Sequence, residues 1–280
     1  MTSPSLTLCA DDYGLAPGIG RAIRALIEAG RLQATGCMTA GPFWPSEAAL
    51  LRPLSRRAEF GVHLTLTDHS PLGTMPDLAP DGRFPPLGKL LKRAMLHRLD
   101  RAEIAAELER QVDSFEAAMG RAPDFLDGHH HVHQLPVVRD IVLDLAARRL
   151  APGGWVRSCW DNPLAILGRG IDPARAGLIA ALGIVLRRHL HRAGIAHNLR
   201  FRGVYDFSGR TPYSALFERF TDLPGPGTLV MCHPGEVDEP LRACETLTDQ
   251  RKVEYAFLAS DEMAASLTRR GLVLAPLPRA

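Results

Sequence analysis

Strand-like apolar runs alternate with amphipathic helical stretches along most of this 280-residue chain, and no other feature limits its fold as strongly. Residues 5–10 predict a strand, a polar turn follows, and helical spacing over 18–29 stops at Gly30. The same order recurs downstream, which favours parallel strands joined by crossover helices. Because 46% of the residues are hydrophobic, a large core can form, and we expect a single α/β domain over 1–280.

Other predicted elements follow the same order, and two segments depart from it. Strands are predicted at residues 34–39, 59–66, 124–128, 228–232 and 272–274, and helices at 46–54, 101–119, 137–149, 173–191, 213–220, 247–258 and 260–270. Residues 67–88 contain five prolines and are too punctuated for a regular element. The pattern loosens over 151–210, where we expect a variable insertion or a lid.

Composition narrows the class of partner and the compartment. The 33 basic residues nearly balance the 31 acidic ones, which argues against a nucleic-acid partner. The N-terminus has no basic region before an apolar stretch, and the five cysteines include no C-x-x-C pair. The longest apolar run, at 176–186, is far short of the ~20 residues of a membrane span. We therefore expect a cytoplasmic protein with reduced thiols and no transmembrane segment.

Four polar clusters follow or interrupt predicted strands at widely separated points of the chain. They are the pair Asp11 and Asp12, the single His63, the run 129–133, and His233. In α/β barrels the active site lies at the carboxyl ends of the strands, where loops are positioned by a rigid scaffold. We therefore expect these side chains to converge on one site.

Each cluster also has a structural interpretation. An acidic pair can cap a helix, although Asp11 and Asp12 lie too early for the helix at 18–29. A lone histidine such as His63 is often only hydrogen-bonded within a strand. The run 127–133 is harder to explain by packing, because it holds four histidines and an aspartate. Imidazole ligates borderline metals, and His129 and His133 have the spacing that shares a helical face.

Four motifs, taken together and in this order, resemble the YdjC-like carbohydrate deacetylases, a family that includes chitooligosaccharide deacetylase and the hopanoid-biosynthesis-associated deacetylases. The motifs span residues 10–235 and read Ala10-Asp11-Asp12-Tyr13-Gly14-Leu15, Gly61-Val62-His63-Leu64, Asp127-Gly128-His129-His130-His131-Val132-His133 and Met231-Cys232-His233-Pro234-Gly235. The resemblance implies a distorted TIM-like (β/α) barrel, related in outline to the polysaccharide deacetylases. It also implies one divalent metal ion, Mg²⁺ or Zn²⁺, and leaves a homodimer open.

By motif position, the resemblance implies that Asp12, His63 and His129 bind the metal and that Asp11 is the catalytic base. We add His233 as the acid that protonates the leaving amine. The remaining motif residues are expected to contact the substrate or to support the metal ligands; they are Tyr13, His131 and His133.

The expected reaction is hydrolysis of the N-acetyl group of an N-acetylglucosamine-containing saccharide or glycolipid, with release of acetate. Two alternatives stay open: a metal-dependent hydrolase of another bond, such as a phosphoester, and a catalytically silent sugar-binding barrel. The apolar stretch 178–190 ends among arginines and histidines. It is either an ordinary packed helix or a segment that docks a lipid-linked sugar at the inner membrane surface.

Overall fold

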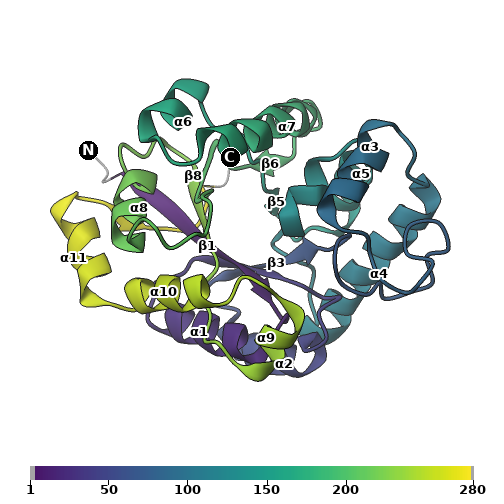
Figure 1. The fold of residues 1–280 in the computed structure, drawn as a ribbon, viewed down its shortest axis with the longest axis horizontal. Helices are drawn as coiled ribbons and strands as arrows, with labels where there is room; N and C mark the ends of the chain where they lie inside the picture. Colours follow the sequence, from purple (N-terminus) through teal and green to yellow (C-terminus); the bar gives the residue numbers. More distant parts are fainter. Residues whose placement is uncertain (1–3, 279–280) are drawn as a thin grey trace.

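The computed structural model describes residues 4–278 and contains one curled, parallel sheet surrounded by helices (Figure 1). The strand order is β6-β5-β4-β3-β2-β1-β8-β7, and β9 pairs with β1. The strands are β1 Ser5–Tyr13, β2 Ala34–Cys37, β3 Glu59–Leu64, β4 Phe125–Gly128, β5 Trp155–Val156, β6 Ala196–His197, β7 Arg200–Arg202, β8 Thr228–Cys232 and β9 Val273–Leu274. This topology confirms the predicted distorted (β/α) barrel.

The helices connect successive strands on the outside of the sheet (Figure 1). They are α1 Pro17–Glu28, α2 Trp44–Leu51, α3 Leu87–Met95, α4 Arg101–Met119, α5 Val138–Arg149, α6 Pro163–Arg169, α7 Pro173–Arg192, α8 Tyr213–Phe220, α9 Glu239–Cys244, α10 Asp249–Leu258 and α11 Asp261–Arg269, with 3₁₀ turns η1 Arg52–Leu54 and η2 His129–Gln134. The sequence sets the ends of α4 clearly. Asp100 accepts hydrogen bonds from the first turn, and Gly120 ends the helix in a left-handed conformation. No helix within residues 4–278 is long and apolar enough to cross a membrane.

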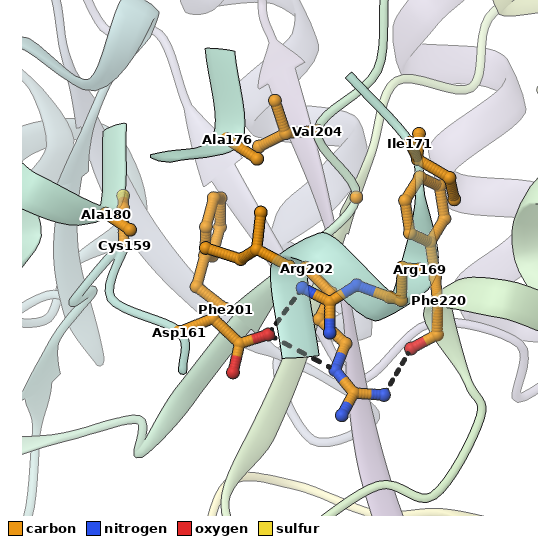
Figure 2. A pocket seen from close by; sticks show the side chains of 12 residues that line it. Cys159, Asp161, Arg169, Ile171, Ala176, Ala180, Phe201, Arg202, Val204 and Phe220 are labelled. Carbon is orange, nitrogen blue, oxygen red and sulfur yellow. Dashed lines mark hydrogen bonds and ion pairs between the residues drawn. The ribbon is translucent and has the colours of Figure 1, made fainter. Parts of the chain in front are cut away.

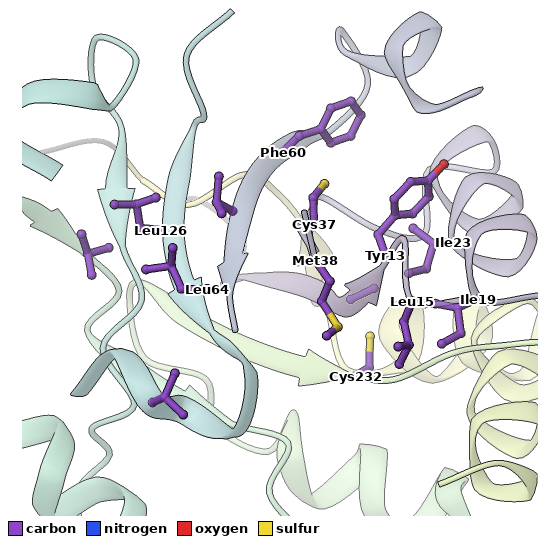
Figure 3. Packing of buried hydrophobic residues seen from close by; sticks show 14 of the residues in the cluster. Tyr13, Leu15, Ile19, Ile23, Cys37, Met38, Phe60, Leu64, Leu126 and Cys232 are labelled. Atoms are coloured by element: carbon purple, nitrogen blue, oxygen red, sulfur yellow. The ribbon is translucent and has the colours of Figure 1, made fainter. Parts of the chain in front are cut away.

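The main core lies between the sheet and its outer helices. Ile19 and Ile23 of α1 pack near Tyr13, Cys37 and Phe60 of the strands (Figure 3). The strands β2, β3, β4 and β8 are buried along their whole length. Burial on both faces is typical of parallel sheets covered by helices.

The sheet has its two edges at β6 and β7, which follow each other directly in the sequence. The buried Asn198 between them bonds across this seam. Its side chain accepts from Ser158 N at 2.7 Å and donates to Ser158 O at 2.7 Å and Arg200 O at 3.0 Å. Trp160 O also accepts a hydrogen bond from Phe201 N. The barrel is thus held together at its open seam by side-chain and loop contacts.

The structure corrects the sequence predictions at three places. Strand β1 continues to Tyr13, so Asp11 and Asp12 lie within it. The segment 151–210 contributes β5, β6 and β7 to the sheet as well as α6 and α7. The histidine run forms the 3₁₀ turn η2, kinked by left-handed φ values at His130 and His131, and so His129 and His133 do not share an α-helical face.

Candidate metal centre

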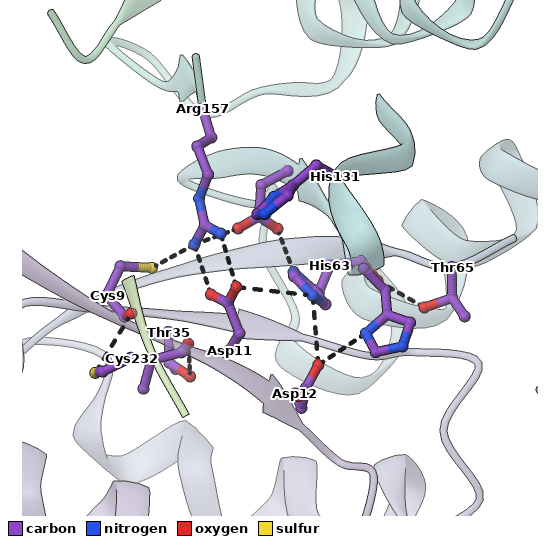
Figure 4. A network of polar contacts seen from close by, with 12 residues as sticks. Cys9, Asp11, Asp12, Thr35, His63, Thr65, His131, Arg157 and Cys232 are labelled. Carbon is purple, nitrogen blue, oxygen red and sulfur yellow. Dashed lines mark hydrogen bonds and ion pairs between the residues drawn. The ribbon is translucent and has the colours of Figure 1, made fainter. Parts of the chain in front are cut away.

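Asp11 and Asp12 lie near the carboxyl end of β1, where the strand is irregular. In a regular strand, neighbouring side chains point to opposite faces. Here Asp12 has a φ of 70°, and the pairing of β1 with β2 shifts register between Ala10 and Tyr13. Aspartate tolerates this left-handed conformation better than most residues. The bulge allows both carboxylates to line the same cavity (Figure 4).

The predicted ligands Asp12, His63 and His129 come together from β1, β3 and η2. Asp12 Oδ1 lies 3.0 Å from His129 Nδ1 and 3.4 Å from His63 Nε2. Ligand atoms about 2.1 Å from one ion, at angles of roughly 90–110°, are about 3.0–3.4 Å apart. All three residues are buried. The donor set therefore fits a single divalent ion.

His63 is oriented by a carboxylate on the neighbouring strand. Its Nδ1 lies 2.7 Å from Asp127 Oδ1, which turns Nε2 toward Asp12. Burial alone would lower the pKa of His63, but the charges of Asp127 and Asp11 outweigh it and raise the pKa to about 10. The surroundings of His63 thus stabilise positive charge. A divalent ion would supply that charge while leaving the imidazole neutral, as a ligand must be.

A second group of candidate ligands, Cys9, Asp11 and Asp127, encloses an arginine (Figure 4). Both Asp11 oxygens accept hydrogen bonds from Arg157, at 2.6 and 2.7 Å. Arg157 also pairs with Asp127 Oδ2 at 2.6 Å and contacts Cys9 Sγ at 3.0 Å. The guanidinium supplies the positive charge at this position, so this group needs no metal ion.

Arg157 determines the protonation state of Asp11. Burial would raise the pKa of Asp11, but the charges of Arg157 and His63 lower it to about 2. The carboxylate is therefore ionised at neutral pH. One of its oxygens lies 4.0 Å from His63 Nε2, beside the position that a metal ion would take.

Helix α10 contributes two side chains, Arg251 and Glu254, that orient groups of the centre. Arg251 donates to Asp12 Oδ2 at 2.6 Å, which leaves Oδ1 facing the two histidines. Burial would raise the pKa of Asp12, but Arg251 and His129 hold it well below its usual range. Glu254 accepts a hydrogen bond from the backbone N–H of His233 at 2.6 Å and one from the Tyr205 hydroxyl at 2.5 Å. The helix thus fixes both a ligand and the loop after β8.

His233 follows β8, and its ring packs edge-on against Phe207. Its Nδ1 is buried without a hydrogen-bond partner in residues 4–278. Burial lowers the pKa of His233 to about 4, although Asp12 and Asp11 act in the opposite direction. The imidazole is therefore neutral at neutral pH and has a nitrogen free to bond a substrate.

The three remaining predicted residues are placed differently. His131 lines the cavity beside Cys159, whose Sγ lies 3.6 Å from its Nδ1. His133 is fully buried, and its Nε2 contacts Arg157 O at 2.9 Å, outside the cavity lining. Tyr13 is also outside the lining; its hydroxyl donates to Glu47 O and accepts from Arg24, each at 2.8 Å. The positions of His133 and Tyr13 indicate support of neighbouring groups and no contact with substrate.

Sequence reasoning did not assign roles to Arg157, Arg251, Glu254 or Asp127. Asp127 carried a usable signal, because it stands two residues before His129 at the end of a predicted strand. Isolated residues such as Arg157 and Arg251 belong to no recognisable pattern, and only the fold brings them to the carboxylates.

The centre lies in a cavity of about 690 Å³, wide enough for a sugar. The wall formed by α7 and by the loops after β7 and α9 is mostly apolar. These apolar residues include Leu178, Ile179, Val204, Phe207 and Leu247, with Arg175, Glu245 and Thr246 among them.

Known relatives cover nearly the whole chain. A carbohydrate deacetylase from Geobacillus stearothermophilus is 28% identical over 267 residues, which are 95% of this chain and 93% of that protein. A chitooligosaccharide deacetylase from Salmonella paratyphi B is 31% identical over 273 residues, 95% of each chain.

Solved structures share the fold at low sequence identity. A protein from Enterococcus faecalis named for cellobiose-phosphate cleavage has a TM-score of 0.74 and 20% identity, with 98% of each chain covered. A peptidoglycan N-acetylglucosamine deacetylase has a TM-score of 0.50 and 9% identity, covering 99% of this chain and 90% of its own. The profile of the family described as YdjC-like protein matches residues 5–269. This chain is therefore a member of the YdjC-like family, whose named relatives are carbohydrate deacetylases.

Proposed function

We propose that this protein is a metal-dependent hydrolase that removes the acetyl group from an N-acetylglucosamine-containing saccharide and releases acetate. One observation carries the proposal: Asp12, His63 and His129 lie within reach of one ion, beside the ionised Asp11, in an open cavity. The relatives named for carbohydrate and chitooligosaccharide deacetylation support an acetylated sugar as the substrate.

Asp12, His63 and His129 would hold the ion. A divalent ion in such a site activates water and polarises the amide carbonyl. Two imidazoles in a set of three ligands favour a borderline ion such as Zn²⁺ over Mg²⁺, which prefers oxygen. Arg251 keeps Asp12 oriented with a single oxygen toward the two rings.

Asp11 is the proposed proton acceptor. It lies next to the ligand set, and the fork of Arg157 holds it ionised and in one orientation. Asp127 binds the same guanidinium and His63, so one network fixes the proposed base and a ligand together.

His233 is the proposed partner of the leaving amine. Its imidazole is neutral before reaction, and its buried Nδ1 is available to a bound acetamide. Negative charge that develops on the substrate raises the proton affinity of a nearby imidazole. His233 can then take up a proton from solvent and pass it to the amine as the C–N bond breaks, while Asp11 keeps the proton lost by the attacking water.

The test is acetate release from N,N′-diacetylchitobiose by protein reconstituted separately with Zn²⁺ and Mg²⁺. Asp11→Asn keeps the shape but cannot accept a proton, so we expect activity to fall about a thousandfold with metal content unchanged. His63→Ala is expected to lower metal content as well as activity. Arg56→Gln, an exposed change far from the site, is the matched control.

Full activity in Asp11→Asn would remove Asp11 from the proposed role. Unchanged metal content in His63→Ala would remove that ligand. Hydrolysis of p-nitrophenyl phosphate without acetate release would replace the deacetylase proposal by a phosphoesterase.

A further inference from the structure

A second large cavity, which we call the basic cavity, lies beside the C-terminal half of α7. Its volume is about 800 Å³, and it shares no lining residue with the metal centre. Two arginines, Arg187 and Arg188, and two histidines, His191 and His197, line it, and no acidic side chain does. An anion is therefore the ligand class that this lining favours.

Arg187 is the strongest indication of an anion site. Its guanidinium stacks 4.2 Å above the Trp160 ring and makes no hydrogen bond or ion pair with any residue in 4–278. Stacking covers a face of the group and leaves its N–H donors free in the plane. Burial and the neighbouring Arg200 lower the pKa of Arg187, as expected for a cation without a counterion.

No carboxylate next to Trp160 is free to neutralise Arg187. Asp161, the following residue, is used on the other side of the loop, where it pairs with Arg169 at 2.6 Å and Arg202 at 3.6 Å (Figure 2). Arg200 also lies 3.5 Å from it. The small cavity beside this network thus contains a carboxylate among its arginines, whereas no carboxylate lines the basic cavity.

The basic cavity also presents apolar surface. Ile184, Ile195 and Leu199 line it, and Leu199 is 41% exposed. Leu178, which lies two turns before Ile184 on α7 and is 59% exposed, belongs to the wall of the metal-centre cavity. The same helix thus carries both cavities, separated by about 13 Å along its axis from Leu178 to Arg187.

We propose that the basic cavity and the adjoining exposed face of α7 dock this protein on anionic phospholipids at a membrane surface. A phosphodiester would accept hydrogen bonds from the N–H groups of Arg187, and acyl chains would cover Leu199 and its apolar neighbours. A free phosphate ion would make no use of the apolar lining.

The experiment is co-sedimentation of the full chain with vesicles of pure POPC or of POPC and POPG at 3:1. We expect binding mainly to the anionic vesicles, weakened by 0.5 M NaCl. Arg187→Gln with Arg188→Gln should weaken binding about twentyfold, because each arginine near an anionic surface contributes about fivefold. Arg56→Gln with Arg83→Gln removes the same charge at exposed sites elsewhere and should change binding less than twofold.

A second variant guards against misfolding of the first. Arg188→Gln with Arg192→Gln changes only exposed side chains and leaves the Arg187 stack intact; it should weaken binding at least fivefold. Equal binding to both vesicle types, or equal loss in the control pair, would overturn the proposal. Saturable binding of inorganic phosphate without vesicle binding would overturn it too. Acetate release from soluble diacetylchitobiose should be the same in all these variants, so the docking and deacetylase proposals fail independently.

Discussion

Five charged side chains meet at the candidate metal centre, and the sum of their charges favours a cation there. Three carboxylates, Asp11, Asp12 and Asp127, face two guanidiniums, Arg157 and Arg251. The pairs are buried, so solvent screens them little. The three carboxylates and two guanidiniums leave a net charge of −1. In the metal-free protein the raised pKa of His63 indicates that a proton on this imidazole compensates that charge.

This balance predicts that metal binding releases a proton. His63 has a pKa of about 10 in the folded metal-free protein, so at pH 7.5 it is protonated and must lose that proton to become a ligand. We expect about one proton per ion, measured by calorimetry in buffers of different ionisation enthalpy. At pH 10.5 the release should fall to about a quarter of a proton per ion. No proton release at pH 7.5 would show that the charges at His63 are balanced in another way.

The raised pKa of His63 also determines how the unfolding free energy changes with pH. The folded pKa of His63 lies above its ordinary value of 6.5, so its contribution is complete below pH 6.5 and is lost as the pH rises toward about 10. Metal-free protein should therefore lose stability over this window in urea titrations with EDTA.

Sequence could single out the candidate ligands but not the groups that orient them. Asp11, Asp12, His63 and His129 stand in motifs at strand ends, where a parallel fold must gather them. Arg251 reaches Asp12 across 239 positions of sequence, and the docking of α10 alone sets that contact.

At the scale of elements, the strands β1, β3 and β8 were predictable because each contains a mostly apolar run bounded by turns. The strands β5, β6 and β7 are only two or three residues long, too short for periodicity to show. Pairing with the rest of the sheet defines them. The kink of η2 was not predictable either, because histidine has no sequence signal for the left-handed φ of His130 and His131.

Strand β2 contributes to the site through the absence of a side chain. A Cβ at Gly36 would lie 3.0 Å from His63 Nδ1 and 3.2 Å from Asp127 Oδ1. Gly36→Ala should push this pair by a few tenths of an ångström and weaken metal binding about tenfold, the usual effect of disturbing the partner of a ligand. Unfolding free energy should change by about 1 kcal/mol or less, because the strand otherwise tolerates alanine.

The measurement for Gly36→Ala is metal affinity by competition with a chelating dye. Gly88→Ala in α3 is the control, since a Cβ there meets no heavy atom within 4 Å. Unchanged affinity in Gly36→Ala would show that the His63 and Asp127 pair is free to move away from β2.

At the scale of the whole molecule, the metal centre depends on a barrel that is open between β6 and β7. Arg157, which fixes Asp11, directly precedes Ser158, and Ser158 is the residue that Asn198 holds across the seam. The seam and the proposed base are therefore linked through two consecutive residues. Ordinary barrels close with a ladder of backbone hydrogen bonds, whereas this seam is held by three hydrogen bonds of the buried Asn198 side chain and by the backbone hydrogen bond from Phe201 N to Trp160 O.

Asn198→Ala should consequently affect both stability and turnover. It leaves the buried N–H and C=O of Ser158 without partners, which costs about 2–3 kcal/mol and lowers Tm by roughly 5–10 °C. Because Ser158 adjoins Arg157, we expect kcat for acetate release to fall several-fold with little change in KM. Asn198→Asp can still accept from Ser158 N, but its carboxylate would face the carbonyl oxygens of Ser158 and Arg200, so it should destabilise the protein at least as much as Asn198→Ala. An Asn198→Ala protein with a lowered Tm and an unchanged kcat would contradict this link. It would show that the seam supports the fold without positioning Arg157.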